Sequence, residues 1–331
     1  MRRVFIYTFV ATLIFVATYL FLKKYSPIKN ESNITKDINI TLKSIKNSLD
    51  DKNVSVKKEE ITILKVKPSK YILATEALDY EEAKKLSKEQ NITQIKNYKP
   101  LCKVEKKETK KRVFNKSNPT LVIIMDDISS QKEIDRLNSL GMKITPSIFP
   151  STKTHKDTPL IASKLKHYMV HTPMQAFNYK HPEIGTLDVN DSLKTIERSI
   201  LKIHKDFPNL AAINNHTGSR FTSDIKAMDR LFCALKKYNI NFIDSKTAPH
   251  TFGKKMGRLY GMPVFCRDVF LDNKADVEYI LKQIRLAVKK AKKSGLCIAI
   301  CHPRQKTFVA LREAKNLLLG VKLIYVDELY R

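Results

Sequence analysis

The chain has 331 residues, 43% of them hydrophobic, which is enough for one large folded domain with appended segments. Its formal net charge is +28, from 61 Lys and Arg against 33 Asp and Glu. The basic residues are spread along the chain and form no compact stripe with interleaved aromatic residues, which argues against nucleic-acid binding. We expect the charge either to lie on a solvated surface or to attract an acidic envelope polymer or anionic lipid.

An uncharged segment, Val4 to Leu22, lies near the start of the chain between two pairs of basic residues. It is long enough to span a bilayer as a helix. It is also longer than the apolar region of a signal peptide, and no clean small-residue cleavage site precedes the lysines. We therefore predict an uncleaved membrane anchor over 1–24, with a cleaved signal peptide as the alternative. The expected location is the inner membrane, crossed once, with the following domain in the periplasm.

Two polar stretches separate this segment from the main domain. Residues 25–60 have scattered apolar side chains and are typical of a flexible linker. Residues 61–117 contain a small, partly ordered segment that is too short for its own core, followed by a second charged linker. Four acidic-x-Asn-x-Ser/Thr sites resemble the extended acceptor of bacterial periplasmic N-glycosylation and indicate a glycoprotein, with chance occurrence in an Asn-rich chain as the alternative. They run from Glu31 to Thr35, Asp37 to Thr41, Asp51 to Ser55 and Glu89 to Thr93.

The cysteines form no Cys-x-x-Cys pair, so a thiolate zinc motif or a redox motif is not expected. Buried free thiols are the default prediction. An exported domain can also form a disulfide, but the spacing does not reveal the pairing. The five are Cys102, Cys233, Cys266, Cys297 and Cys301.

From residue 118 onward, predicted strands and helices alternate. The predicted strands are 121–125, 143–149, 168–170, 211–214, 241–243, 264–269, 297–300 and 323–326. The predicted helices are 131–140, 160–165, 190–205, 224–238, 254–259, 277–293 and 308–319. Such alternation implies parallel strands with crossover helices, and we predict an α/β fold with a closed or nearly closed (β/α) barrel of seven or eight strands. No Gly-x-Gly-x-x-Gly or phosphate-loop pattern is present, which argues against nucleotide binding of those kinds.

Acidic and histidine side chains recur at the carboxyl ends of five predicted strands. These ends of parallel strands meet at one edge of an α/β fold, where sites are built. A hydrophobic core needs none of these groups there, so the pattern indicates chemistry. The residues are Asp126 and Asp127, His171, His216, Asp244 and His302.

Two imidazoles and one carboxylate are a common ligand set for a catalytic zinc with an open position. Of Asp126 and Asp127, one can bind metal while the other accepts a proton, and His171 and His216 come from neighbouring strands. A zinc-bound water has its pKa lowered to about 7, and His302 is placed to protonate a leaving group. Each residue alone also has a structural interpretation, as a turn, a cap or a strand terminator. The histidines given no role are His155, His167, His181, His204 and His250.

Six motifs in order resemble the divergent polysaccharide deacetylase family over 118–331. They are Ile124-Met125-Asp126-Asp127, His171-Thr172-Pro173-Met174, Asn214-Asn215-His216-Thr217-Gly218-Ser219, Phe242-Ile243-Asp244-Ser245, Arg267-Asp268-Val269-Phe270-Leu271-Asp272 and Ile298-Ala299-Ile300-Cys301-His302-Pro303. The resemblance implies a deformed (β/α) barrel of the carbohydrate deacetylase superfamily. It also implies a divalent metal, commonly zinc, and hydrolysis of an N- or O-acetyl group on a sugar.

The same resemblance assigns roles to individual residues. Asp126 would be the catalytic base and Asp127 a metal ligand. The superfamily's His-Ser/Thr-x-x-His motif is incomplete, because Gln175 and Arg220 stand where its second histidine would follow His171 or His216. His171 and His216 are therefore the preferred pair of ligands, and His302 the second catalytic group. Cys301 stands where a glycine is expected and would crowd the pocket.

Further polar residues in these motifs would bind sugar hydroxyls or stabilise an oxyanion. They are Asn214, Asn215, Ser219, Arg220, Asp244, Arg267, Asp268 and Asp272. A structural ion-pair network is the alternative for Arg267 and Asp268. The expected function is a metal-dependent deacetylase of an envelope polysaccharide or peptidoglycan. The alternative is a weakened barrel that binds glycan or regulates an envelope protein partner.

Overall fold

The computed structural model describes residues 98–102 and 114–331. The predicted anchor over 1–24, the linker over 25–60, the four acceptor sites and most of 61–117 lie outside the described residues. Within the described ranges, no helix is long and apolar enough to cross a membrane.

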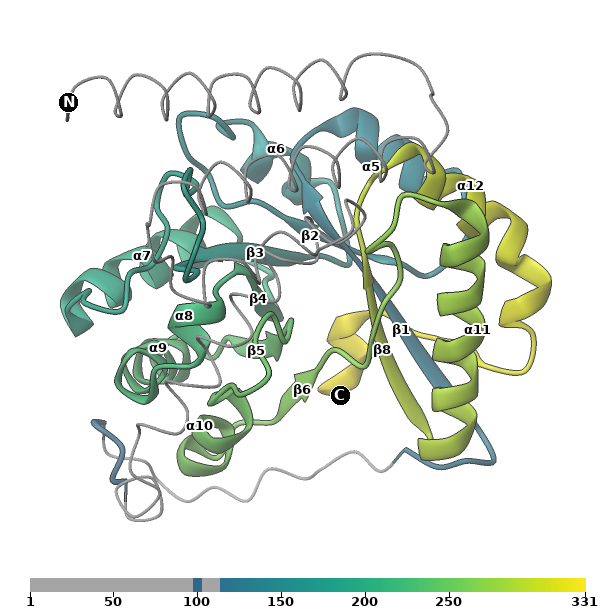
Figure 1. The fold of residues 1–331 in the computed structure, drawn as a ribbon. Helices are drawn as coiled ribbons and strands as arrows, with labels where there is room; N and C mark the ends of the chain where they lie inside the picture. Colours follow the sequence, from purple (N-terminus) through teal and green to yellow (C-terminus); the bar gives the residue numbers. More distant parts are fainter. Residues whose placement is uncertain (1–97, 103–113) are drawn as a thin grey trace, which may run out of the picture. The chain divides into compact units, whose positions relative to one another are not determined.

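One parallel sheet organises residues 114–331 (Figure 1). Its strands are β1 (Thr120–Ile128), β2 (Thr145–Ile148), β3 (Met169–Met174), β4 (Ala212–Thr217), β5 (Asn241–Asp244), β6 (Val264–Cys266), β7 (Val269–Phe270), β8 (Leu296–Cys301) and β9 (Lys322–Leu323). They follow the order β6-β5-β4-β3-β2-β1-β8-β7, and β9 pairs with the start of β1. Every strand pair is parallel, as the alternation of strands and helices predicts.

The sheet curls into a half-barrel. It stays open because its two edge strands, β6 and β7, are not hydrogen-bonded to each other. The predicted single strand over 264–269 is wrong, because the chain changes edges there. The backbone N–H of Arg267 still donates to Asp244 O at the end of β5, at 2.9 Å, and that of Asp268 already donates to Ile298 O on β8, at 2.8 Å. Two consecutive residues thus bridge the edges of the sheet and give the barrel its deformed shape.

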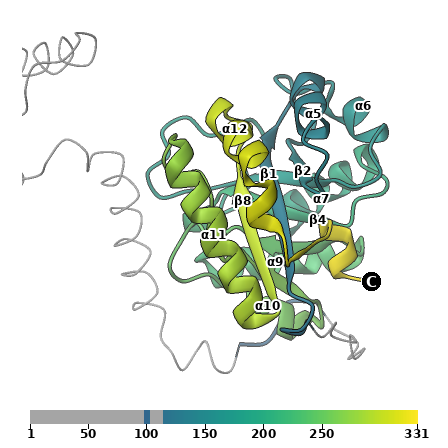
Figure 2. The same ribbon diagram turned by 90° about the vertical axis from the view of Figure 1, so that its right-hand side faces the viewer.

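Helices cover the outer face of the sheet (Figure 1). They are α5 (Gln131–Asn138), α6 (Thr158–Ser163), α7 (Leu193–Asp206), α8 (Ser219–Thr222), α9 (Ile225–Lys237), α10 (Gly253–Tyr260), α11 (Val277–Ser294) and α12 (Gln305–Glu313). Figure 2 shows α11 running along β8 and β1, which it contacts. The predicted helix over 308–319 ends as the 3₁₀ helix η3 (Ala314–Leu318), and the predicted strand over 323–326 is β9 followed by η4 (Val326–Leu329).

Local sequence signals explain where the helices begin. Ser130 and Glu133 form a capping box at the start of α5. Asp224 accepts a hydrogen bond from Ala227 N at the start of α9. Ser192, and not the predicted Asn190, caps α7, because its hydroxyl accepts from Thr195 N at 3.1 Å.

Alternation along the strands separates two apolar layers. Leu121, Ile123 and Met125 of β1 pack in the core between sheet and helices. Val122 and Ile124 point the other way, into the half-barrel, where they join side chains from β8 and from the C-terminal segment. The inner layer therefore lies beneath the carboxyl-end groups that the strands carry.

Residues 98–102 are fastened to α9 and α10. A disulfide joins Cys102 to Cys233, so the prediction of free thiols is wrong for these two, whereas Cys266, Cys297 and Cys301 are free. Nearby, the buried carboxylate of Asp229 accepts hydrogen bonds from Tyr98 Oη at 2.8 Å, from Tyr260 Oη at 2.5 Å and from the backbone of Leu101. The cross-link spans 131 positions of sequence.

Candidate metal centre

An irregularity in β1 brings both aspartates to the same site. Between Met125 and Ile128 the pairing advances three residues on β1 but two on β2, which is a bulge. Asp127 adopts a left-handed conformation with φ of 60°. A regular strand would send adjacent side chains to opposite faces, but the bulge lets both Asp126 and Asp127 reach His171, at 3.6 and 3.3 Å. Such backbone strain is typical of functional sites.

Three side chains converge at the carboxyl edge of β1, β3 and β4. Asp127 Oδ1 lies 3.0 Å from His216 Nδ1 and 3.3 Å from His171 Nε2. The two imidazole nitrogens lie 3.1 Å apart. Within the described residues, these three form a group whose ligand atoms could hold a metal ion. We refer to Asp127, His171 and His216 as the triad.

The dimensions of the triad fit a zinc-class cation. Ligand atoms bound at about 2.1 Å to a tetrahedral zinc are about 3.4 Å apart, close to the 3.0–3.3 Å found here. Two imidazole lone pairs and a carboxylate oxygen that meet at one point repel one another unless a cation or a proton lies between them. The chemistry of the donors and their separation therefore both fit a divalent metal.

Asn214 on β4 orients the site from beneath. Its buried amide Nδ2 donates to both oxygens of Asp126, at 2.8 and 3.0 Å. Its Oδ1 accepts from Ser147 Oγ at 2.7 Å and faces His171 Nδ1 at 2.9 Å. Because an amide oxygen only accepts, His171 Nδ1 carries the hydrogen. The other ring nitrogen, Nε2, is directed at Asp127 and His216.

Opposite charges shift the pKa values of His171 and Asp127. Burial alone would lower the pKa of His171, but the carboxylates of Asp126 and Asp127 outweigh it and raise that pKa to about 8. Burial raises the pKa of Asp127, but hydrogen bonds with His171 and His216 hold it well below its usual range. Without metal, a proton on His171 is the natural substitute for the cation.

His302 faces the triad from the end of β8. Its Nε2 lies 3.8 Å from Asp127 Oδ2. Its Nδ1 contacts Asp272 Oδ1 at 3.0 Å, and Asp272 Oδ2 accepts from Thr307 Oγ1 at 2.7 Å. A buried carboxylate thus orients the imidazole, so that Nε2 faces the triad, the position that a general acid would need. Asp272 was only one of many polar candidates in the sequence, and the structure gives it this specific position.

Aromatic side chains form a wall that sequence reasoning missed. Phe149, after β2, lies with its ring 5.6 Å from His171 and 5.0 Å from His216. His155, which was given no role, stacks on Phe149 at 4.7 Å. Tyr179, 46% exposed, lies 6.5 Å from the His216 ring. Side chains in the loops after β2 and β3 show no periodicity that would have marked them.

Several residues predicted to bind substrate serve the loops around the site. Asn215 bonds the backbone of Thr217 and Ser245. Ser219 accepts from Phe177 N at 3.1 Å. Asp244 is fully buried and accepts from Lys246 N and from Thr251 Oγ1.

Arg267, Asp268 and Arg220, which were also predicted to bind substrate, make backbone hydrogen bonds outside the triad. Asp268 is exposed and accepts from Ile298 N at 2.9 Å, in the lower half of β8. Arg267 donates to the backbone oxygens of Ser245 and Lys246, which supports its structural interpretation. Arg220 is exposed, and its backbone N–H donates to Gln175 O at 3.1 Å.

Cys301 does not crowd the site. Its side chain belongs to the core between sheet and helices, and its Sγ contacts Ile124 O at 3.5 Å. The neighbouring Ile300 points into the half-barrel instead. The expectation drawn from the missing glycine is therefore wrong, because strand alternation turns residue 301 outward.

Comparison with known proteins identifies the family. The model of the divergent polysaccharide deacetylase family matches residues 123–330, and the chain belongs to this family. It is 29% identical over 212 residues to the uncharacterized protein YibQ of Escherichia coli K12, covering 63% of this chain and 66% of that protein, just under two thirds of its length. It is 27% identical over 221 residues to an uncharacterized protein of Haemophilus influenzae, covering 66% of this chain and 79% of that protein. A crystal structure of the uncharacterized protein ATU2773 from Agrobacterium tumefaciens shares the fold, with a TM-score of 0.57 and 18% identity over 66% of this chain and 92% of that one.

Proposed function

We propose that this protein is a metal-dependent hydrolase that removes acetyl groups from an envelope polysaccharide or glycan. The observation that carries the proposal is the triad, a His-His-Asp group of metal-binding dimensions. It is flanked by a second carboxylate, Asp126, and by a third imidazole, His302. The family's name points to acetylated polysaccharide as the substrate class.

The triad would hold the cation, zinc being the best fit to two imidazoles and a carboxylate. When bound, such an ion polarises a carbonyl and lowers the pKa of a coordinated water. Asp126, held by Asn214, is placed to accept a proton as general base. His302, held by Asp272, is placed to donate a proton to the leaving nitrogen or oxygen of the sugar.

The location that we propose is the cell envelope, with residues 1–24 as an inner-membrane anchor and the barrel in the periplasm. The Cys102–Cys233 disulfide supports this, because disulfides persist in oxidising compartments such as the periplasm. The linker predicted over residues 25–60 would let the barrel meet a polymer at some distance from the membrane. Neither nucleic acid nor nucleotide is part of the proposal.

The test is deacetylase activity of the full-length chain on N-acetylated and O-acetylated envelope glycans, with zinc supplied. We expect acetate release that a chelator abolishes and that Asp127→Ala and His171→Ala reduce at least ~100-fold. His204→Ala, an exposed histidine on α7, is the matched control and keeps wild-type activity. Glycan binding by a folded wild-type chain without acetate release from any substrate would favour the alternative, a barrel that binds glycan or regulates an envelope enzyme.

A further inference from the structure

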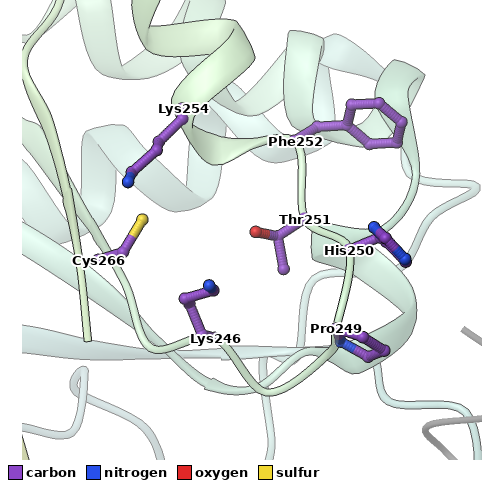
Figure 3. Close-up of a pocket in the computed structure, with 7 residues that line it drawn as sticks. All are labelled: Lys246, Pro249, His250, Thr251, Phe252, Lys254 and Cys266. Atoms are coloured by element: carbon purple, nitrogen blue, oxygen red, sulfur yellow. The ribbon is translucent and has the colours of Figure 1, made fainter. Parts of the chain in front are cut away.

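A cavity of about 300 Å³ opens on the same edge of the sheet as the triad, although no triad residue lines it. It lies between the carboxyl ends of β5 and β6 and the start of α10, and its lining includes Lys246, Thr251, Lys254 and Cys266 (Figure 3). No residue of the cavity takes part in the proposed chemistry. Its volume is at the lower end of the range for small-molecule sites, enough for one compact group.

The charge that the cavity presents is positive. Figure 3 shows the amino groups of Lys246 and Lys254 directed from two sides into the space that Thr251 and Cys266 also face. Among the described residues, no ion pair joins either amino group to a carboxylate.

The nearby acidic groups are directed at other partners or are neutral. Asp244 is fully buried and accepts from Thr251 Oγ1 at 2.6 Å and from Lys246 N at 2.9 Å. Burial raises its pKa, whereas these hydrogen bonds and the charge of Lys246 lower it. Burial and the neighbouring Asp244 raise the pKa of the Cys266 thiol to about 12, so the thiol is neutral at physiological pH. Asp268 turns away to the N–H of Ile298.

The loop that forms the cavity is joined to the metal centre. Ser245 Oγ accepts from Asn214 Nδ2 at 3.1 Å, and Asn214 also holds Asp126. Arg267 clamps the same loop by donating to Ser245 O at 2.6 Å and to Lys246 O at 2.7 Å. The cavity is one to two strand spacings from β4, or ~5–10 Å, a distance that about one or two sugar rings cover.

We propose that this cavity is a subsite for an anionic group, a carboxylate or a phosphate, borne by the glycan that is bound at the triad. The inference rests on the proposed function and deepens it, because it names an acidic glycan as the preferred substrate. Lys246 and Lys254 attract the anion, and the clamped loop keeps the subsite in register with the reacting acetyl group. The subsite acts in binding and selection and takes no part in bond breaking.

The test compares three N-acetylated tetrasaccharides: neutral chitin, a peptidoglycan fragment with free lactyl carboxylates, and a phosphorylated chitin fragment. Calorimetry on the full-length chain in neutral detergent, with chelator present, measures binding without turnover. The Lys246→Gln/Lys254→Gln double variant is compared with Lys282→Gln/Lys289→Gln, which removes the same charge from exposed positions of α11. Figure 1 shows α11 well apart from α10.

We expect the wild type to bind at least one of the two acidic fragments more tightly than neutral chitin. The fragment that it prefers shows whether the subsite takes a carboxylate or a phosphate. The cavity variant loses about tenfold in affinity for that probe, because exposed ion pairs contribute up to ~1 kcal/mol each. Its affinity for neutral chitin stays unchanged, and its salt dependence falls. The control variant keeps the wild-type preference.

Equal binding of acidic and neutral probes by the wild type, or an undiminished preference in the cavity variant, overturns the subsite. The proposed function is judged separately by acetate release with zinc. A chain that binds the acidic probe through the two lysines yet releases no acetate from any probe keeps the subsite and loses the deacetylase assignment. A chain that deacetylates all probes equally keeps the deacetylase assignment and loses the subsite.

Discussion

Replacing Asn214 by alanine should damage the fold and the metal centre together. The amide makes a charge-assisted contact to Asp126 and three further contacts, with Ser147, Ser245 and His171. A hydrogen bond to a charged group contributes ~1.5–3 kcal/mol and a neutral one about 1 kcal/mol. Water entering the space that is left recovers part of the loss, so we expect the free energy of unfolding to fall by about 3–5 kcal/mol.

The same substitution should weaken metal binding, because Asn214 holds His171 Nδ1 and so points Nε2 at the triad. Loss of such a supporting contact typically costs ~10–100-fold in metal affinity. Urea unfolding with chelator present gives the stability without a contribution from bound metal, and competition with a zinc indicator gives the affinity.

The control for this prediction is Asn241→Ala at the start of β5. Its Nδ2 makes one hydrogen bond, to Ala211 O at 3.0 Å, away from the carboxyl edge. It should lose about 1 kcal/mol of stability and keep wild-type zinc affinity. The reasoning is refuted if Asn214→Ala keeps wild-type zinc affinity while folded, or if it loses no more stability than the control.

Three further predictions concern separate parts of the structure. Cys102→Ser should lower the free energy of unfolding by up to ~5 kcal/mol, because the disulfide closes a loop of 131 positions; urea unfolding with and without dithiothreitol should show the difference only without reductant. Burial raises the pKa of Asp272, but hydrogen bonds with His302 outweigh it and hold that pKa below its ordinary value. The Asp272 carboxylate therefore stabilises the fold above about pH 4, and this stabilisation is lost as the pH falls. Asp272→Asn should therefore lower stability more at pH 7 than at pH 3, and an equal loss at both would contradict this. Tyr179→Ala should raise KM for a glycan about fivefold with little change in kcat, since its exposed ring lies beside His216; a loss confined to kcat would count against a binding role.

Much of the barrel could be predicted because its strands are short apolar runs bounded by polar residues. β1 and β8 lie within a few residues of the predicted strands. The rule that parallel strands end at one edge also predicted that His171 and His216, the candidate ligand pair, would meet. Strand alternation also separates residues that look equivalent in sequence. Asn214 lies under the site, whereas its neighbour Asn215 supports the following loops.

The features that were missed depend on contacts distant in sequence. The run 264–269 is suited to a strand except at the charged pair Arg267-Asp268, and the pairing of its two halves with β5 and β8 shows that the strand breaks there. The disulfide joins residues 131 positions apart, which no spacing rule predicts. The left-handed Asp127 is compatible with its sequence, but the bulge that produces it arises from the register with β2.

Metal content of the purified full-length chain tests the central claim most directly. Elemental analysis would compare the wild type with His216→Ala and with the exposed control His204→Ala. We predict about one zinc-class ion per chain in the wild type and in the control, and its loss from His216→Ala. A well-folded wild type that binds no divalent metal after reconstitution, or a His216→Ala variant that binds as much as the wild type, would contradict the account.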